Sequence, residues 1–176
     1  VADAMGNVVA TTQTINDLFG AKILIPGLGV IPNNYMNLYD PRPGHALSLA
    51  PGQRVTTSMS PMMALRDGKL VYAFGLPGGK RIFPSAFQAL VNLIDHGMTL
   101  QEAVEAPRVW TEGHALEVEL AFPDTVRAAV TSMGHDVVQM PTVGGGMNGI
   151  HVRDDNTVSG AACWRADGTP VAFADG

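Results

Sequence analysis

The chain has 176 residues, of which 46% are hydrophobic and 15% are charged, and its formal net charge at pH 7 is -5. This composition predicts a folded chain with an apolar core and excludes an intrinsically disordered one. The negative charge gives no electrostatic reason to bind nucleic acid or an anionic membrane. No apolar run approaches the roughly 20 residues that a membrane-spanning helix needs. Cys163 is the only cysteine, so an internal disulfide is excluded.

The first third of the chain predicts one strand and one long loop. Residues 7–15 alternate loosely, as in a half-buried strand, after a hairpin turn at Gly6 and Asn7. Residues 21–53 are rich in Gly, Pro and Asn, and a loop of this length usually serves a site. Residues 62–65 and 70–74 then predict a hairpin with its turn at Asp67 and Gly68.

Three helices are expected next. Residues 84–95 have helical spacing that stops at Gly97, and one apolar stripe is formed by Phe83, Phe87, Leu90, Val91 and Ile94. Residues 99–102 have the form of a capping box, which opens a short helix ending before Pro107. The third helix starts at Pro123 and ends at Gly134.

The second half of the chain also predicts strands, at residues 116–118, 136–139, 149–152, 159–164 and 170–173, with a last hairpin turn at Asp167 and Gly168. Strands, then helices, then strands are typical of an α+β layered domain rather than of a βαβ repeat. We expect a single domain over residues 1–176. Because the sequence starts inside a strand-like run without a methionine, we expect it to be the later part of a longer polypeptide.

The stretch "GLPGGKRI", residues 75–82, lies between a predicted strand and a predicted helix. Adjacent glycines leave backbone N–H groups unshielded, and such groups bind a phosphate or the oxyanion of an acyl-transfer intermediate. A plain tight turn explains the same glycines equally well. The phosphate interpretation is disfavoured, because Lys80 is followed by Arg81 instead of the Ser or Thr of a Walker A loop.

Other common catalytic patterns are missing from the sequence. The five histidines never occur at i, i+4, and with a single cysteine they offer no metal-ligand cluster, so neither a metal nor a cofactor is expected. No G-x-S-x-G nucleophile elbow occurs. Glu117 and Glu119 alternate along a predicted strand, and a solvated edge explains them.

Uncharged polar side chains stand out instead, in three clusters at residues 11–16, 33–34 and 56–60. Together with the glycine pair they suit the recognition of carboxylate and amide groups in a mostly apolar pocket. Taken alone, the first cluster is better explained by the β-propensity of threonine.

Taken together, these stretches resemble the small subunit of the γ-glutamyltranspeptidase family. The motifs "VADAMGNVVATTQTINDLFG", "GVIPNNYM", "TTSMSP", "GLPGGKRI" and "NLIDHGMTLQEAVEAPRVW" occur in the family's order and spacing across essentially the whole chain. The stretches "FGLPGGKRIFPSAFQALVNLIDHGMTLQEAVEAPRVW" and "VGGGMNGI…GAACWRADGTP" are most similar to class IV cephalosporin acylases, which remove a glutaryl group from a cephalosporin nucleus. The resemblance implies an N-terminal-nucleophile hydrolase with an αββα sandwich, of which this chain would form the small-subunit half.

In this family the precursor cuts itself, and the new N-terminal Thr becomes the nucleophile with its own α-amine as general base. The resemblance puts that Thr just before Val1, so the nucleophile is not among these residues. The expected partner is the large subunit from the same precursor. A periplasmic or secreted location is expected because family members are often exported, although the single cysteine leaves a cytoplasmic one open.

The resemblance also assigns roles to residues that are present. Thr14 matches the residue whose hydroxyl contacts the catalytic Thr, and Asn16 matches an amide that positions substrate and nucleophile. Thr57 and Ser58 match a hydroxyl pair that holds the substrate's carboxylate.

The glycine pair has a role in the family as well. Gly78 and Gly79 match the oxyanion hole, because residues without side chains let two backbone amides point at the tetrahedral oxyanion. Pro77 would stiffen the approach, and Lys80 and Arg81 are expected to add positive potential nearby.

The substrate loop departs from the family pattern. After the two asparagines, γ-glutamyl enzymes carry an acidic or amide residue and, three positions later, an Asp, which grip the substrate's α-ammonium. Here these positions hold Tyr35 and Leu38, and neither pairs with a cation. With Asn34, they are therefore expected to line a site for a glutaryl amide, which has the γ-glutamyl shape without the α-amine.

Three functions remain open at this point. The first is an amide hydrolase of glutaryl-type side chains that acts through a covalent acyl-enzyme. The second is a γ-glutamyl hydrolase or transferase acting on glutathione-like amides. The third is a non-catalytic binding fragment, which only the missing nucleophile supports.

Overall fold

The structure is a computed structural model that describes residues 1–173, and its contacts divide the chain into two compact units. The larger unit consists of Val1–Thr12 and Met59–Gly176, and the smaller unit is Gln13–Ser58. No helix among residues 1–173 is both long enough and apolar enough to cross a bilayer.

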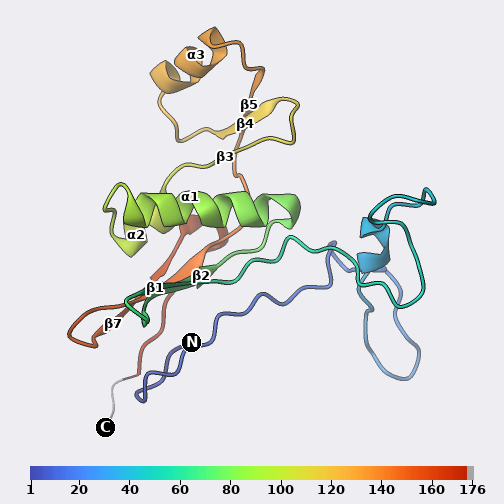
Figure 1. The fold of residues 1–176 in the computed structure, drawn as a ribbon, viewed down its shortest axis with the longest axis horizontal. Coiled ribbons are helices and arrows are strands. Elements are labelled where there is room, and N and C mark those ends of the chain that lie inside the picture. Colours follow the sequence, from blue (N-terminus) through green and yellow to red (C-terminus); the bar gives the residue numbers. More distant parts are fainter. Residues whose placement is uncertain (174–176) are drawn as a thin grey trace. The chain divides into compact units, whose positions relative to one another are not determined.

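A four-stranded antiparallel sheet lies at the centre of the larger unit (Figure 1). Its strands are β1 (Met62–Arg66), β2 (Lys69–Gly75), β6 (Asn148–Val152) and β7 (Val158–Ala162), in the order β1-β2-β6-β7. The predicted hairpin between β1 and β2 is confirmed. Asp67 and Gly68 both have positive φ, 52° and 76°, as the tight turns of two-residue hairpins require.

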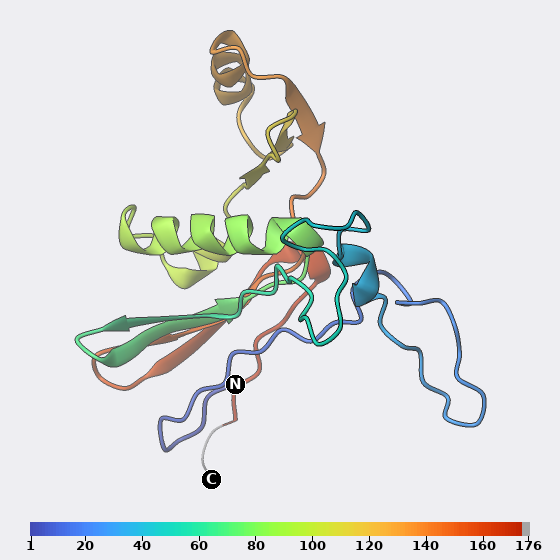
Figure 2. The same ribbon diagram turned by 45° about the vertical axis from the view of Figure 1, so that its right-hand side comes forward.

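Two helices, α1 (Ile82–Ile94) and α2 (Leu100–Glu105), cover one face of this sheet (Figures 1 and 2). The core between the two layers consists of side chains from both helices, the sheet and the segments beside it: Phe74, Leu76, Ile82, Ala86, Ala89, Leu93, Leu100, Ala103, Val104, Met147, Ala161 and Cys163. The predicted capping box opens α2, since Thr99 Oγ1 accepts from the Glu102 N–H at 3.3 Å and the Glu102 carboxylate accepts from the Thr99 N–H at 2.8 Å. One helical layer on one sheet is the α+β arrangement that the sequence predicts.

The apolar stripe of α1 coincides only in part with its buried face, since Leu90 packs against the core but three other members of the stripe are exposed. Phe83, Phe87 and Ile94 are 55%, 53% and 61% exposed. The buried face lies on other positions of the helix: Ile82, Ser85, Ala86, Ala89 and Leu93. Because most of these side chains are small, the helix axis can approach the sheet closely, and the bulky aromatic rings are left on the outward face.

A second sheet in the larger unit consists of β3 (Val109–Trp110), β4 (Leu116–Glu119) and β5 (Val137–Met140), in the order β3-β4-β5. Strands β4 and β5 are parallel and are joined by α3 (Asp124–Ser132), which begins after Pro123 as predicted. This segment is a βαβ unit within the α+β fold, and the sequence pattern did not predict it. A parallel pair needs such a crossover connection.

Two predicted strands do not form in the described part of the chain. In residues 7–15 the only pairing is an isolated bridge between Ala2 and Val8. Residues 170–173 form no strand or β-bridge. Asp167 is the C-cap of a 3-10 helix, η3 (Trp164–Ala166), and does not form the predicted hairpin turn. Strand formation needs a neighbour that supplies hydrogen bonds, so β-propensity alone was insufficient here.

The smaller unit contains little regular structure, which confirms the predicted long loop. Its one helix is a single 3-10 turn, η1 (Tyr35–Leu38). Isolated bridges join Ile25 to Val30 and Asp40 to Ser48.

Candidate active site

The smaller unit brings Thr14, Asn16 and Asn34 together. Asn16 has a positive φ of 77°, and its N–H donates to Thr14 Oγ1 at 2.8 Å. The Asn16 side-chain amide donates to Asn34 Oδ1 at 2.9 Å and to Asn37 Oδ1 at 3.2 Å. Three predicted site residues, 14, 16 and 34, are therefore linked by direct hydrogen bonds.

Asp17 completes this amide cluster and was not among the site residues predicted from the sequence. The side-chain amide of Asn34 donates to Asp17 Oδ2 at 2.6 Å, and the Asp17 N–H donates to Asn34 Oδ1 at 3.2 Å. Because the Asn34 side chain both donates and accepts within the cluster, its orientation is fixed. Asn34 thus holds the start of η1 against residues 16–17.

The helix η1 follows directly and carries Tyr35 and Leu38, both half-buried, and no acidic residue. The acidic residues of the smaller unit are Asp17 and Asp40, and both already accept hydrogen bonds from side chains. The Arg42 guanidinium donates to the two Asp40 oxygens at 2.9 and 2.7 Å and lowers the pKa of that carboxyl.

Thr57 and Ser58 end the smaller unit in a stretch without helix or strand. Thr57 is exposed and Ser58 is half-buried. Gly78 and Gly79 belong to the larger unit.

The glycine pair connects β2 to α1 in a backbone conformation that side chains disfavour. Gly78 has φ 149° and Gly79 has φ 58°. A Cβ atom on Gly78 would lie 2.8 Å from Gly144 Cα, which is backbone and cannot move aside like a flexible side chain. Gly78 is the N-cap of the 3-10 turn η2 (Gly79–Arg81), which runs directly into the N-terminus of α1, where the helix dipole favours a negative charge.

The two cations after the glycines are neutralised by carboxylates. Lys80 Nζ lies 2.7 Å from a Glu112 oxygen, and Arg81 makes two hydrogen bonds to Glu117 at 2.7 and 2.5 Å. Arg81 also lies over the Trp110 ring, 4.2 Å from its centroid. These ion pairs therefore offset the positive potential that Lys80 and Arg81 were expected to add near Gly79.

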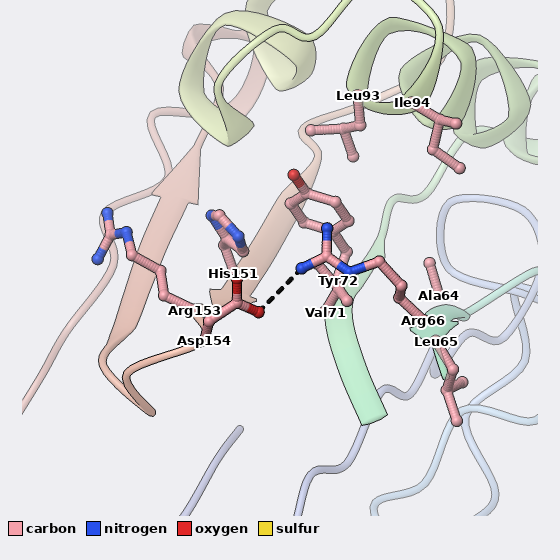
Figure 3. Close-up of a pocket in the computed structure, with 10 residues that line it drawn as sticks. All are labelled: Ala64, Leu65, Arg66, Val71, Tyr72, Leu93, Ile94, His151, Arg153 and Asp154. Atoms are coloured by element: carbon pink, nitrogen blue, oxygen red, sulfur yellow. Dashed lines mark hydrogen bonds and ion pairs between the residues drawn. The ribbon is translucent and has the colours of Figure 1, made fainter. Parts of the chain in front are cut away.

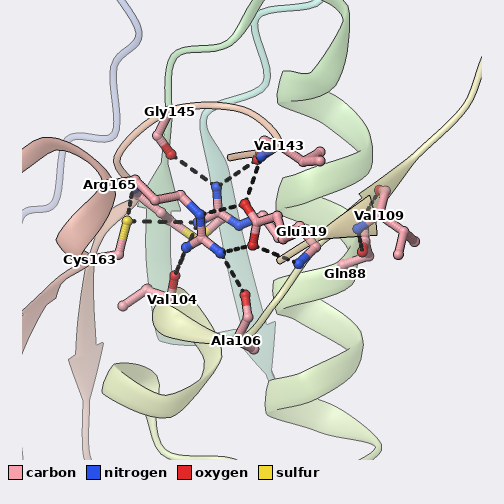
Figure 4. Close-up of polar contacts among 11 residues, drawn as sticks. Gln88, Val104, Ala106, Val109, Glu119, Val143, Gly145, Cys163 and Arg165 are labelled. Atoms are coloured by element: carbon pink, nitrogen blue, oxygen red, sulfur yellow. Dashed lines mark hydrogen bonds and ion pairs between the residues drawn. The ribbon is translucent and has the colours of Figure 1, made fainter. Parts of the chain in front are cut away.

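The solvated edge predicted for Glu117 and Glu119 is wrong. The Glu119 side chain is 0% exposed and pairs with Arg165, whose side chain is also 0% exposed (Figure 4). The Glu117 side chain is 15% exposed. Two acidic residues on one face of a strand were matched by arginines far away in the sequence.

The larger unit also has an open cavity of about 640 Å³. It lies at the end of the sheet, where the cations Arg66 and Arg153 flank Tyr72 and His151 (Figure 3). Burial and these two cations lower the pKa of His151. None of the predicted site residues lines this cavity, and no three His, Cys, Asp or Glu residues among positions 1–173 are grouped to hold a metal ion.

The comparison with known families decides the relationship. The model of the gamma-glutamyltranspeptidase family matches residues 1–173. This chain belongs to the γ-glutamyltranspeptidase family. The Acylase ACY 1 proenzyme of Pseudomonas sp. strain SE83 is 66% identical over 176 residues, which are 100% of this chain and 32% of the relative. The Glutathione hydrolase proenzyme of Bacillus subtilis strain 168 is 36% identical over 175 residues, 98% of this chain and 30% of the relative.

Solved structures agree with this assignment to the γ-glutamyltranspeptidase family. The γ-glutamyltranspeptidase of Pseudomonas nitroreducens complexed with L-DON has a TM-score of 0.90 at 28% identity, covering 99% of this chain and 97% of that chain. The cephalosporin acylase of Bacillus halodurans has a TM-score of 0.83 at 26% identity, covering 89% of this chain and 30% of that chain. The predicted α+β fold of N-terminal-nucleophile hydrolases is thereby confirmed. The chain spans about a third of the length of the curated relatives named above.

Proposed function

We propose that this chain is the small-subunit part of an autoprocessed amide hydrolase that removes a glutaryl-type acyl group, for example from a cephalosporin nucleus. The acyl group is transferred to an N-terminal threonine that precedes Val1 in the precursor, and the amine leaves. Water then hydrolyses the resulting ester and regenerates the threonine. The 66% identity to a relative named an acylase, against 36% to a glutathione hydrolase, supports this choice.

The observation that carries the proposal is the composition of η1. Tyr35 and Leu38 are half-buried at the positions where the family resemblance implies groups that bind an α-ammonium. An ammonium placed against Leu38 would lose water without gaining a hydrogen bond, which is costly. A glutaryl group ends in a carboxylate and has no such amine. The assigned hydroxyl pair, Thr57 and Ser58, would hold that carboxylate.

In this mechanism the chain's own residues prepare the reaction in two ways. Thr14 and Asn16, already joined by a hydrogen bond, orient the nucleophile and the acyl group. The N–H groups of Gly78 and Gly79, at the start of the turn η2 that leads into α1, donate to the oxyanion of the tetrahedral intermediate. Losing one such donor typically costs about 10²–10³ in kcat.

The proposed partner is the large subunit of the same precursor. Exposed apolar side chains on α1, including Phe83, Phe87 and Ile94, support a covering partner, because a monomer rarely exposes such groups together. Met63 on β1 is also 45% exposed. The one-third coverage of the proenzyme relatives leaves room in the precursor for a subunit of larger size.

A γ-glutamyl hydrolase or transferase is the second candidate, favoured by the glutathione hydrolase relatives. Parallel assays of the processed protein with a glutaryl amide and a γ-glutamyl anilide separate the two. We expect kcat/KM to be higher for the glutaryl amide. A preference for the γ-glutamyl anilide would overturn the proposal, and no turnover of either by fully processed protein would favour a binding role.

A further inference from the structure

The glycine pair packs against a second glycine-containing segment, residues 143–145, which we call the supporting loop. The Gly145 N–H donates to the carbonyl of Pro77 at 2.8 Å. The Cβ position of Gly78 is 2.8 Å from Gly144 Cα, and the Cβ position of Gly145 is 2.7 Å from Pro77 Cγ. The two backbones therefore touch without intervening side chains, so a shift of the supporting loop moves Gly78 with it.

Two buried charged residues hold the supporting loop, and the contact of one of them, Glu119, with Val143 is drawn in Figure 4. The Arg108 guanidinium donates to the carbonyls of Val143 and Gly145 at 3.3 and 2.9 Å. Glu119 accepts from the Val143 N–H at 2.6 Å. The exposed fractions of Arg108 and Glu119 are 2% and 0%.

These two residues are in turn fixed to the end of α2. Glu119 accepts from the Arg108 N–H at 3.0 Å and pairs with the Arg165 guanidinium through both of its oxygens. Arg165 also donates to the carbonyls of Val104 and Ala106, at 3.1 and 2.9 Å, and Arg108 donates to the Val104 carbonyl at 3.0 Å. Carbonyls at the end of a helix lack intrahelical partners, so these arginines complete α2 and gain a rigid anchor.

The cluster contains two guanidiniums and one carboxylate, and Arg108 has carbonyls rather than a carboxylate against its guanidinium. Burial and the nearby Arg165 charge lower the pKa of Arg108 to about 10, so it remains protonated at neutral pH. Burying a cation in this way is expensive unless it is fully hydrogen-bonded. Arg108 Nη1 lies 3.6 Å from the Cβ position of Gly144, the residue whose Cα lies 2.8 Å from the Cβ position of Gly78.

We propose that Arg108 and Glu119 are positioning residues for the oxyanion hole, acting through the supporting loop. This inference rests on the proposed function, in which the Gly78 and Gly79 amides bind the oxyanion. The Arg108 guanidinium and the Glu119 carboxylate fix the position of the supporting loop. The loop in turn fixes the direction in which the Gly78 N–H points. A misplacement of about 1 Å in such a site can cost about 10²-fold in rate.

The most direct test keeps both charged residues and changes only the contact between the supporting loop and Pro77. Gly145→Ala introduces a Cβ at 2.7 Å from the Pro77 ring. The matched control is Gly160→Ala, on β7, which introduces a Cβ at 2.7 Å from the Pro170 ring. Both variants are made in the complete precursor, and kcat is normalised to the burst of acyl-enzyme. We expect kcat for a glutaryl amide to fall roughly 10²-fold in Gly145→Ala with KM little changed, and to stay near wild type in Gly160→Ala. Equal kcat values in the two variants would overturn the proposal.

A second test uses Arg108→Lys, which keeps the charge but cannot donate to Val143, Gly145 and Val104 in the same fork geometry. We expect a lower kcat, an unchanged KM, and weaker inhibition by 4-boronobutanoic acid, whose tetrahedral adduct mimics the intermediate. Wild-type inhibition by this boronic acid in Arg108→Lys would refute the positioning role. If instead Gly79→Ala kept full turnover, the oxyanion assignment in the proposed function would fail, whatever the Arg108 and Gly145 variants showed.

Discussion

Replacing Glu119 by glutamine tests whether the buried cluster stabilises the fold. The two Glu119 oxygens accept four hydrogen bonds, two from Arg165 and one each from the N–H groups of Arg108 and Val143. A glutamine keeps the shape but offers one acceptor oxygen, and its NH₂ group must face another N–H donor. It also leaves two buried guanidiniums without a carboxylate.

Removing one partner of a buried ion pair costs about 3–5 kcal/mol, because the remaining charge is buried without compensation. The matched control is Glu117→Gln, on the same face of β4. Glu117 pairs with Arg81, whose side chain is 31% exposed, so water can solvate the guanidinium once the pair is broken. More exposed pairs typically contribute about 0–1 kcal/mol.

The measurement is the thermal unfolding midpoint of the assembled, processed protein for wild type and both variants. We expect the midpoint to fall several times further in Glu119→Gln than in Glu117→Gln. Equal shifts, or a Glu119→Gln midpoint within error of wild type, would show that the cluster is not the stabilising feature inferred from its burial.

Three further changes test the site and the fold. Leu38→Asp should raise kcat/KM for a γ-glutamyl amide by roughly 10- to 150-fold, since a charged hydrogen bond contributes about 1.5–3 kcal/mol. The same change should lower kcat/KM for a glutaryl amide. If glutaryl hydrolysis is untouched, Leu38 does not contact the acyl group. Gly79→Ala has open space at its Cβ position but strains a backbone with φ 58° by about 1–2 kcal/mol, so the variant should fold with a displaced Gly79 amide. We expect kcat to fall roughly 10²-fold through the disturbed oxyanion donor, and normal turnover would restore the plain-turn interpretation. Thr99→Ala removes one half of the capping box on α2 and should cost about 1 kcal/mol of stability without changing kcat, which a thermal scan beside a steady-state assay checks.

Local signals in the sequence were sufficient for most elements of the fold. The capping box at Thr99, the turn at Asp67 and the helix start after Pro123 each depend on neighbouring residues, and each was predicted. The pairing of β4 with β5 depends on residues 21 positions apart and was not predicted. The strand expected at residues 7–15 failed for the same reason, since no strand among the described residues lies beside its second half.

Side-chain environments were harder to predict than backbone elements. The apolar stripe of α1 includes Phe83 and Phe87, yet close packing selected Ala86 and Ala89 for the buried face. Charge pointed to Glu119 as solvent-exposed, but Arg165, 46 residues later, allows it to be buried. The site residues came from the family motifs and not from periodicity. The amide cluster around Asn34 could have been suspected from the density of Asn and Asp in two loop segments.

The burial of Cys163 gives the chain a built-in chemical reporter. This thiol is 1% exposed, accepts the Met147 N–H at 3.1 Å and lies 3.9 Å from the Arg108 guanidinium. Because the sulfur is buried in the core, a thiol reagent reaches it only when that core opens, and with excess reagent the labelling rate equals the opening rate. Comparing this labelling rate with the rate of global unfolding separates local opening from global unfolding. The energetics of the region behind the glycine pair can thus be followed in the native sequence, with no introduced probe.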